Sequence, residues 1–383
     1  MWKRVSLVLL ATLSLSAWEN EIRIENSNFT LSQASIPSVF TGGEEERYLY
    51  NYDRLRIHDT LTHEGFYATA IVDLVNYAGS SYIRSPEFGY MEQNKPDVPF
   101  DIHTDFHYYG NEKGAVYGKI HRLYTGYSDE KHHVTLGIQK ISMGVGHIWT
   151  PTDLYNPKNS FALEPDEVFG VMALSYSYAP SALSTIQAIV SVQENERVKY
   201  GFRYKAFLGA ADVGVSFIHS EDIRMYGYEI EGDLWDTGAQ WRSEGGYYQS
   251  DTLDKAFFQG ILGVDYAFQN GINWTVEGYY SSDTFTYAEK LSYFNNEMAA
   301  NLVQSNVYLG STVSYDFDLA WSGSLLLAGS FEEEASSFVA PSVTYTLNDH
   351  HRLRFGGMLY VGSDESEFGI FGDTFYLNWK WNF

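Results

Sequence analysis

Histidine and carboxylate side chains that could take part in catalysis are present, but their spacing fits no catalytic arrangement. His103, Asp105 and His107 alternate along a segment expected to be extended, so they share one face of a strand. At ~3.3 Å per residue the two histidines are about 13 Å apart, too far to bind one metal ion. The chain has no Gly-x-Ser-x-Gly, His-Glu-x-x-His or P-loop motif, and it has 0 Cys for disulfides or thiolate ligands. We therefore expect no catalytic residue, no metal site and no cofactor.

Charged residues instead alternate with apolar residues along extended segments. Arg54 and Arg56 alternate with Leu55 and Ile57, for example. Side chains of a strand point alternately to its two faces, so such a strand is charged on one face and apolar on the other. The same alternation predicts polar-face positions for a further set: Lys199, Arg203, Lys205, Glu229, Glu231, Asp233, Arg352, Arg354 and Lys380. If these strands close into a barrel in lipid, the charged faces line its lumen.

The composition is typical of many short strands with aromatic girdles. Aromatic residues make up 17% of the chain, with 31 Tyr, and 33 Gly stand against 9 Pro. Mean hydropathy is −0.27, and no internal apolar run has the length of a membrane-spanning helix. The formal net charge of −24 argues against nucleic acid as a partner, because phosphate binding needs a basic surface. We expect an all-β protein, a transmembrane antiparallel β-barrel.

The N-terminus has the pattern of a secretory signal peptide. Lys3 and Arg4 precede an apolar run from Val5 to Ala17 that ends in small residues. The run is shorter than the roughly 18 apolar residues of a membrane anchor. We therefore expect residues 1–17 to be removed. Residues 18–45 are expected to be a periplasmic lead-in or a weak first strand.

From residue 46 to 383 the alternation predicts about 18 segments of ~10 residues, the length that crosses a bilayer when tilted. Residues 100–109 are one of these segments. Short turns alternate with longer acidic loops, as at the periplasmic and extracellular ends of such barrels. Counting back from a periplasmic C-terminus, however, puts residues 78–99 on the periplasmic side, where so long a loop is unexpected. The strand count is therefore left at 16 to 18.

The last strand resembles the C-terminal assembly signal of Gram-negative outer-membrane β-barrels. Its apolar face consists of alternating residues that end on an aromatic terminus: Phe375, Leu377, Trp379, Trp381 and Phe383. In a closed barrel this strand pairs with the first, and its apolar face meets lipid. The resemblance implies location in the outer membrane and two partners, the membrane lipid and the barrel assembly machinery.

A second resemblance lies in the middle of the chain. Gly144 and Gly146 break a strand, and the sequence Trp-Thr-Pro-Thr-Asp-Leu-Tyr-Asn-Pro follows at 149–157. This is similar to the Trp-x-Pro-Thr-Asp-Leu-Phe-Asn-Pro motif of porin-like outer-membrane proteins, although Ile138 and Met143 replace their frequent Arg and Trp. We expect a loop near 143–167 that folds inward and narrows the pore; the alternative is an ordinary surface loop. The residues expected at the constriction are Trp149, Pro151, Asp153, Tyr155 and Asn156.

Together these patterns predict a porin-like channel for passive diffusion of small hydrophilic solutes or ions. We expect the charges to form separate basic and acidic walls, with the strands of Arg54, Arg352 and Lys380 side by side; the alternative is that these side chains are simply solvated. Porins of this size resemble one another in forming trimers, which implies a homotrimer. Two other functions stay open: an adhesin or receptor that binds through its acidic extracellular loops, and a barrel hydrolase.

Overall fold

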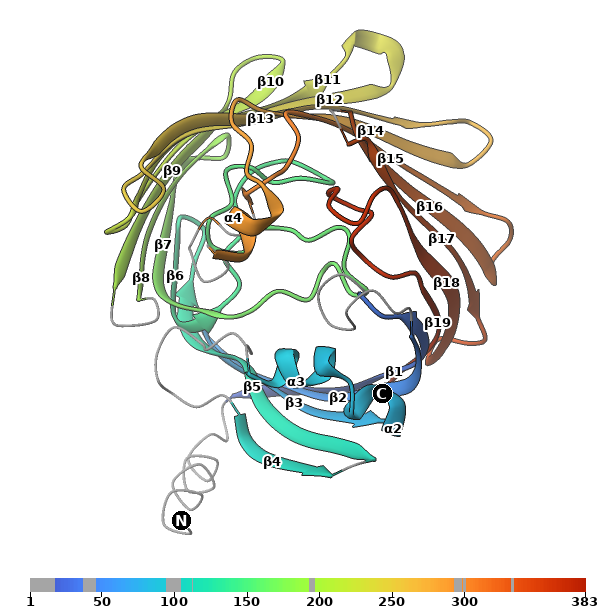
Figure 1. Ribbon diagram of the computed structural model, residues 1–383. Helices are drawn as coiled ribbons and strands as arrows, with labels where there is room; N and C mark the ends of the chain where they lie inside the picture. Colours follow the sequence, from blue (N-terminus) through green and yellow to red (C-terminus); the bar gives the residue numbers. More distant parts are fainter. Residues whose placement is uncertain are drawn as a thin grey trace.

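The computed structural model describes residues 18–36, 46–93, 105–111, 113–192, 197–292, 298, 301–331 and 334–383. The expected signal peptide, residues 1–17, lies outside this part of the chain. The described strands form one antiparallel sheet that closes on itself, because β1 (Glu19–Ala34) pairs with both β2 (Arg47–His63) and β19 (Thr374–Asn382). Figure 1 shows the strands as a ring around a lumen that several connecting segments enter. The predicted all-β barrel is confirmed.

The remaining elements follow in chain order around the ring. In the described part of the chain, helical segments lie in connections between strands: α2 (Ser80–Ile83), α3 (Pro86–Gln93), the 3-10 turn η4 (Trp235–Thr237) and α4 (Tyr287–Ser292). The other strands are β3 (Phe66–Ala78), β4 (Asp105–Asn111), β5 (Gly114–Ser128), β6 (His132–Gln139), β7 (Val171–Ser181), β8 (Ser184–Val192), β9 (Val198–Phe207), β10 (Ala211–His219), β11 (Ile223–Asp233), β12 (Ala239–Ser250), β13 (Lys255–Ala267), β14 (Ile272–Ser281), β15 (Val307–Asp316), β16 (Trp321–Ser330), β17 (Ser336–Thr346) and β18 (His351–Val361).

Eighteen strands close the barrel, and β4 is an addition to it. β3 pairs with β5 along its whole length, whereas β4 pairs only with Gly114–Lys119 of β5. Residues 105–109 of the predicted barrel-crossing segment 100–109 therefore add to the wall without closing it, and residues 100–104 lie outside the described part of the chain. By the strand order, the connection between β3 and β5 starts and ends at the same end of the barrel as the other long loops, so the unexpected periplasmic position of residues 78–99 came from the strand count near the N-terminus.

The two ends of the barrel differ in their connections. One end, here the turn end, holds short connections such as 64–65, 182–183 and 208–210, and β19 ends there. The other end, here the loop end, holds the long connections 79–113, 140–170 and 282–306. In outer-membrane barrels the short turns are periplasmic and the long loops extracellular.

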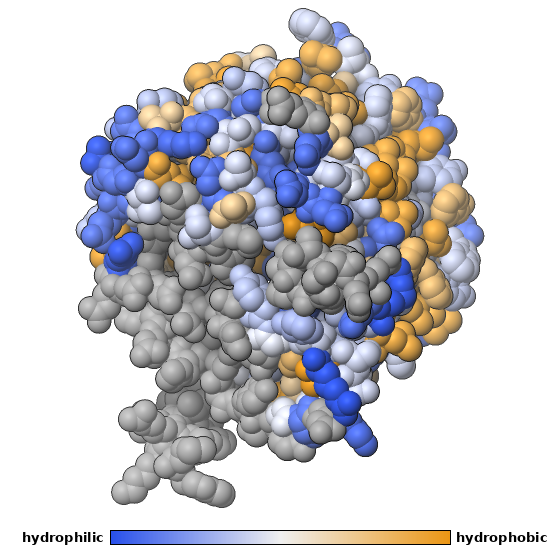
Figure 2. All heavy atoms as spheres, viewed as in Figure 1, coloured by the Kyte–Doolittle hydropathy of each residue, from blue (hydrophilic) through white to orange (hydrophobic). Residues whose placement is uncertain are grey.

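Apolar residues cover most of the outer face of the barrel, the face that points away from the lumen. Tyr200, Phe202 and Tyr204 of β9 are 51%, 43% and 40% exposed, whereas Lys199, the residue before Tyr200, is 3% exposed. Figure 2 shows hydrophobic residues on the rim at the right of the view and hydrophilic residues across the mouth. The alternation predicted from the sequence thus separates a lipid-facing side from a lumen side. Among the described residues no helix has the length and apolarity needed to cross a membrane.

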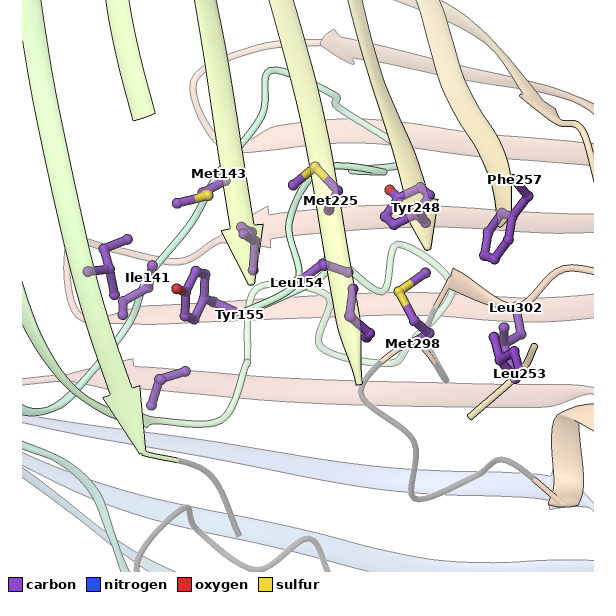
Figure 3. Packing of buried hydrophobic residues seen from close by; sticks show 14 of the residues in the cluster. Ile141, Met143, Leu154, Tyr155, Met225, Tyr248, Leu253, Phe257, Met298 and Leu302 are labelled. Atoms are coloured by element: carbon purple, nitrogen blue, oxygen red, sulfur yellow. The ribbon is translucent and has the colours of Figure 1, made fainter. Parts of the chain in front are cut away.

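The loop end of the lumen is filled by packed side chains from wall and loops. Leu154, Met298 and Leu302 from the loops pack with Met225 and Tyr248 from the wall, all nearly without exposure (Figure 3). Against the opposite wall, α2 stacks on β2 through Tyr82 and Tyr50, with ring centroids 3.8 Å apart. In the 282–306 loop, α4 is a short helix, and Met298 and Leu302 pack into the lumen cluster.

A candidate pore crossed by an inner loop

Two wall carboxylates bind the backbone of the loop between β6 and β7, residues 140–170. Glu244 on β12 accepts hydrogen bonds from the amides of Val145, Gly146 and Thr152 at 2.7 to 2.9 Å. Glu277 on β14 accepts the amides of His147, Ile148 and Trp149 at 2.8 to 3.0 Å. Both carboxylates have no exposed surface. Each satisfies amides that an irregular buried backbone would otherwise leave unpaired.

The turn formers of the loop bind its own backbone. Asp153 accepts the amides of Met143, Tyr155 and Asn156 at 2.8 to 3.0 Å. Asn156 accepts the amide of Ile141 and donates to the carbonyl of Phe169, which joins the two ends of the loop. Burial raises the pKa of Asp153 to about 6, although the three amides act in the opposite direction.

Other wall residues fix the tip of the loop. Lys199 donates to the carbonyl of Leu154 at 2.8 Å, and Tyr248 donates to the carbonyl of Pro151. The ring of Trp149 packs beside those of Tyr279 and Tyr308 on β14 and β15. Of the expected constriction residues, Trp149, Pro151 and Tyr155 contact the wall between β9 and β15, whereas Asp153 and Asn156 bind the loop itself.

The second half of the loop reaches the opposite wall. Glu164 accepts two hydrogen bonds of 2.9 Å from Arg54 on β2, and Glu167 accepts two, of 2.9 and 2.8 Å, from Arg56. Arg56 also donates two hydrogen bonds to Asp73 on β3. The loop therefore spans the lumen from β12–β15 to β2. Bidentate arginine–carboxylate pairs of this kind fix the orientation of both side chains and also neutralise their charges.

A bulge in β5 adds a histidine and an arginine side chain beside this contact. The register of β3 with β5 shifts between Ile71 and Val72, so that His121 has no partner and both it and Arg122 point into the lumen. Arg122 donates to the carbonyl of Val168 at 2.6 Å. A cavity of ≈ 640 Å³ lies here; its charged lining residues are Arg56, Arg122, Lys140, Asp166 and Glu167, and His121 and His133 also line it.

The wall from β9 to β13 contains a smaller cavity of ≈ 280 Å³ with acidic lining. His147 of the loop lies in it with Arg242, and its carboxylates are Asp212, Glu231, Asp233 and Asp265. On the same wall Arg203 donates two hydrogen bonds to Glu229, and Lys205 forms an ion pair with Glu231. Arg203 and Lys205 of β9 are thus paired with acids of β11, while Lys199 binds the loop. They do not form the separate basic wall that was expected.

Three further basic residues of the predicted lumen lie near the turn end. Arg352 and Arg354 are exposed, while Lys380 forms an ion pair of 2.8 Å with Glu25. The expectation that the strands of Arg54, Arg352 and Lys380 lie side by side was wrong, because β1 lies between β2 and β19. Glu25 of β1 therefore lies between Lys380 and Arg54.

The sequence reasoning found the arginines and the loop but missed the loop's acidic partners. Glu164 and Glu167 follow the recognised motif in a stretch with no periodicity, and Glu244 and Glu277 look like ordinary lumen residues. Glu164 and Glu167 are three residues apart, which places both on one side of a turn. The sequence alone does not predict that turn. Among the described residues no group of three or more His, Asp or Glu could hold a metal ion.

Comparisons with known proteins place this architecture among outer-membrane porins of Gram-negative bacteria. Acinetobacter baumannii OccAB1 has a TM-score of 0.59 at 9% identity, over 96% of this chain and 97% of that chain. Pseudomonas aeruginosa OpdK has a TM-score of 0.57 at 8% identity, over 95% and 99%. P. aeruginosa OccK5 (OpdH) has a TM-score of 0.56 at 9% identity, over 95% and 97%. No family model and no curated protein matches the sequence. The fold is that of a porin-like outer-membrane β-barrel.

Proposed function

We propose that this protein is a passive channel for small hydrophilic solutes or ions across the outer membrane. The observation that carries the proposal is the loop 140–170, which is bound to both walls and has a charged cavity on each side. If the interior were a sealed core, we would expect packed side chains beside the loop and not charged cavities. Neighbours with the same fold are porins, and one has a structure with vanillate, a small organic solute.

Selectivity follows from the charge on the two sides of the loop. The cavity against β2–β6 has a basic excess, and the cavity against β10–β13 has an acidic excess. A solute that passes between them experiences a field across the pore, so charge and dipole orientation affect its passage. The proposed constriction is the tip of the loop from Trp149 to Asn156. The proposed pore-lining residues are Arg54, Arg56, Lys199, Arg203, Lys205, Glu229, Glu231, Asp233, Arg352, Arg354 and Lys380.

Single-channel recording of the refolded protein in planar bilayers tests this function. Stable open steps, with ion selectivity from the reversal potential in a salt gradient, are expected. Silence from a barrel that is folded and inserted, as judged by heat-modifiable migration, would refute the channel. In that case binding of a partner by the acidic outer loops would be the function to examine. Assay of the same preparation for lipid and peptide hydrolysis tests the proposal that the protein is not an enzyme.

A further inference from the structure

A row of aromatic side chains crosses the outer face of β9 to β13 near the loop end. Each ring is the register partner of the ring on the next strand, in the order Phe202, Phe217, Tyr226, Tyr247 and Phe258. Phe202, Tyr226 and Tyr247 are 43%, 54% and 42% exposed, so the row faces outward. Aromatic rings gather where the hydrocarbon of a membrane meets its headgroups. This row therefore marks the membrane interface at the loop end.

The next row toward the loop end is polar. Two residues further along each strand, the outer face carries four register partners in turn: Tyr200, His219, Arg224 and Gln249. These four residues are here called the polar row. At ~3.4 Å per residue it lies about 7 Å beyond the rings, where headgroups lie and acyl chains end. Val190 on β8 and Ala256 on β13 bound it at its two sides.

Arg224 is the cation of the polar row, and its charge is not neutralised within the described part of the chain. It is exposed and has no ion pair and no hydrogen bond among the described residues. Two acids of the adjoining turn have other partners. Glu221 forms an ion pair of 3.1 Å with Arg197, and Asp222 is buried and accepts the amide of Thr252 at 2.6 Å. The guanidinium of Arg224 is therefore available to an anion from outside the chain.

A second outer-face arginine at the loop end, Arg47 on β2, is arranged differently. Its guanidinium carbon lies 5.9 Å from the centre of the Phe375 ring, and its Nη1 donates to the hydroxyl of Ser32 at 3.3 Å. These contacts hold its side chain against the barrel wall. The two arginines thus share a face and an end of the barrel but differ in their partners.

We propose that the polar row binds the phosphate of a phosphorylated glycolipid in the outer leaflet of the outer membrane. Arginine binds phosphate with two N–H groups at once, and Tyr200 and Gln249 supply further donors in the same row. The rings below the row contact the sugar and the start of the acyl chains. The occupant is a membrane lipid because Arg224 lies outside the lumen, beside the aromatic row and at the end of the barrel that faces the outer leaflet. This site is separate from the proposed solute path.

Binding of diphosphoryl lipid A to the purified barrel in detergent, measured by native mass spectrometry, tests the proposal. The barrel should bind diphosphoryl lipid A at least ~5-fold more tightly than lipid A from which both phosphates have been removed. This comparison needs no substitution in the protein. Equal affinities for the two lipids, or displacement of lipid A by an equimolar amount of inorganic phosphate, would overturn the proposal.

Two arginine variants locate the site. Arg224→Gln should lower the affinity for diphosphoryl lipid A at least ~5-fold, whereas Arg224→Lys should lower it less because the charge remains. Arg47→Gln is the matched control and should change the affinity less than about 2-fold, because Arg47 already has partners within the chain. Equal losses in Arg224→Gln and Arg47→Gln would show general attraction of a charged rim and would overturn the site.

Conductance and heat-modifiable migration of the same preparations separate this site from the channel. Both should be unchanged in Arg224→Gln, because Arg224 is on the outer face, away from the lumen. A silent barrel that still prefers the phosphorylated lipid would refute the proposed function alone. A conducting barrel without that preference would refute the lipid site alone.

Discussion

Trp149 and Glu277 are joined by a hydrogen bond of 2.8 Å from the backbone amide of the first to Oε1 of the second, although 128 residues separate them. The bond is one of six backbone amide contacts that two wall carboxylates make with the inner loop. The position of the loop in the lumen therefore depends on side chains of β12 and β14, and this dependence can be measured.

Glu277→Gln should loosen the loop. One oxygen becomes an amide that faces backbone amides, so at least one donor loses its acceptor, and hydrogen bonds to charged groups contribute about 1.5–3 kcal/mol each. We expect larger fluctuations of the open-channel current. Glu231→Gln removes a lumen carboxylate that binds Lys205 and not the loop. Equal noise in both variants would show that charge, not loop release, is responsible.

Gly144→Ala should disturb the same anchor from the loop side. Gly144 has a φ of +83°, which favours glycine, and a Cβ at this position would lie 2.3 Å from Glu244 Oε2. We expect the loop to leave Glu244 and the current to fluctuate as in Glu244→Gln. Gly209→Ala is a matched control, because its φ is +74° and its Cβ would meet nothing within 4 Å. Similar behaviour of the two variants would contradict the anchor.

Neutralising Arg352 and Arg354 should shift ion selectivity toward cations. Both are exposed near the turn end, and Arg352 has no ion pair among the described residues, so their charge acts on passing solutes. We expect the reversal potential of Arg352→Gln with Arg354→Gln to report a ~2-fold or larger rise in cation over anion permeability. Arg224→Gln on the outer face is the control. An unchanged reversal potential would place these arginines outside the solute path.

Loop stability should depend on pH through Asp153. Burial raises its pKa to about 6, above that of a solvated aspartate, so the packed loop binds this proton more tightly than a released loop does. The contribution is fully present below about pH 4 and is lost as the pH rises through 6. Current fluctuations should therefore be smaller at pH 5 than at pH 7.5. Asp153→Asn should remove the difference, and a variant that keeps it would contradict this assignment.

Removal of Phe383 should impair assembly. Its amide donates to the carbonyl of Ile24 at 2.9 Å, and its ring ends the apolar face of β19. If the assembly machinery reads this terminus, deletion should lower the amount of heat-modifiable barrel in outer membranes several-fold while refolding in detergent changes less. Phe371→Ala, an exposed aromatic in the preceding loop, is the control. Equal losses for both variants would contradict a terminal signal.

The strand alternation could be predicted because lipid selects apolar residues on every outer face, and this pattern is local in sequence. The alternation failed to predict two strands correctly, for physical reasons. β1 could not be distinguished from a lead-in because Asn26, Asn28 and Thr30 occupy its outer face. Residues 100–109 alternate, yet β4 pairs only at the loop end. The expected upper count of eighteen agrees with the barrel only because the two errors cancelled. The expected set included β4 and omitted β1.

The partners of the lumen charges could not be predicted in the same way. Alternation tells which face a side chain occupies, but not the register between strands or the path of a loop. Arg203 and Glu229 meet across β10, and Arg54 meets Glu164 from a loop 110 residues away. Alternation alone therefore predicted separate charged walls. In the structure, ion pairs between strands partly take the place of those walls.

Pairing of the first strand with the last has a consequence for the order of folding. Asn378 on β19 donates to Ser27 on β1 across a sequence separation of 351, among the longest contacts a chain of this size can make. Such contacts form slowly because the intervening chain must first lose its conformational freedom. Until synthesis and export deliver the final residues, β1 has an open edge that could pair with other chains. The chain should therefore depend on periplasmic protection until its last nine-residue strand arrives.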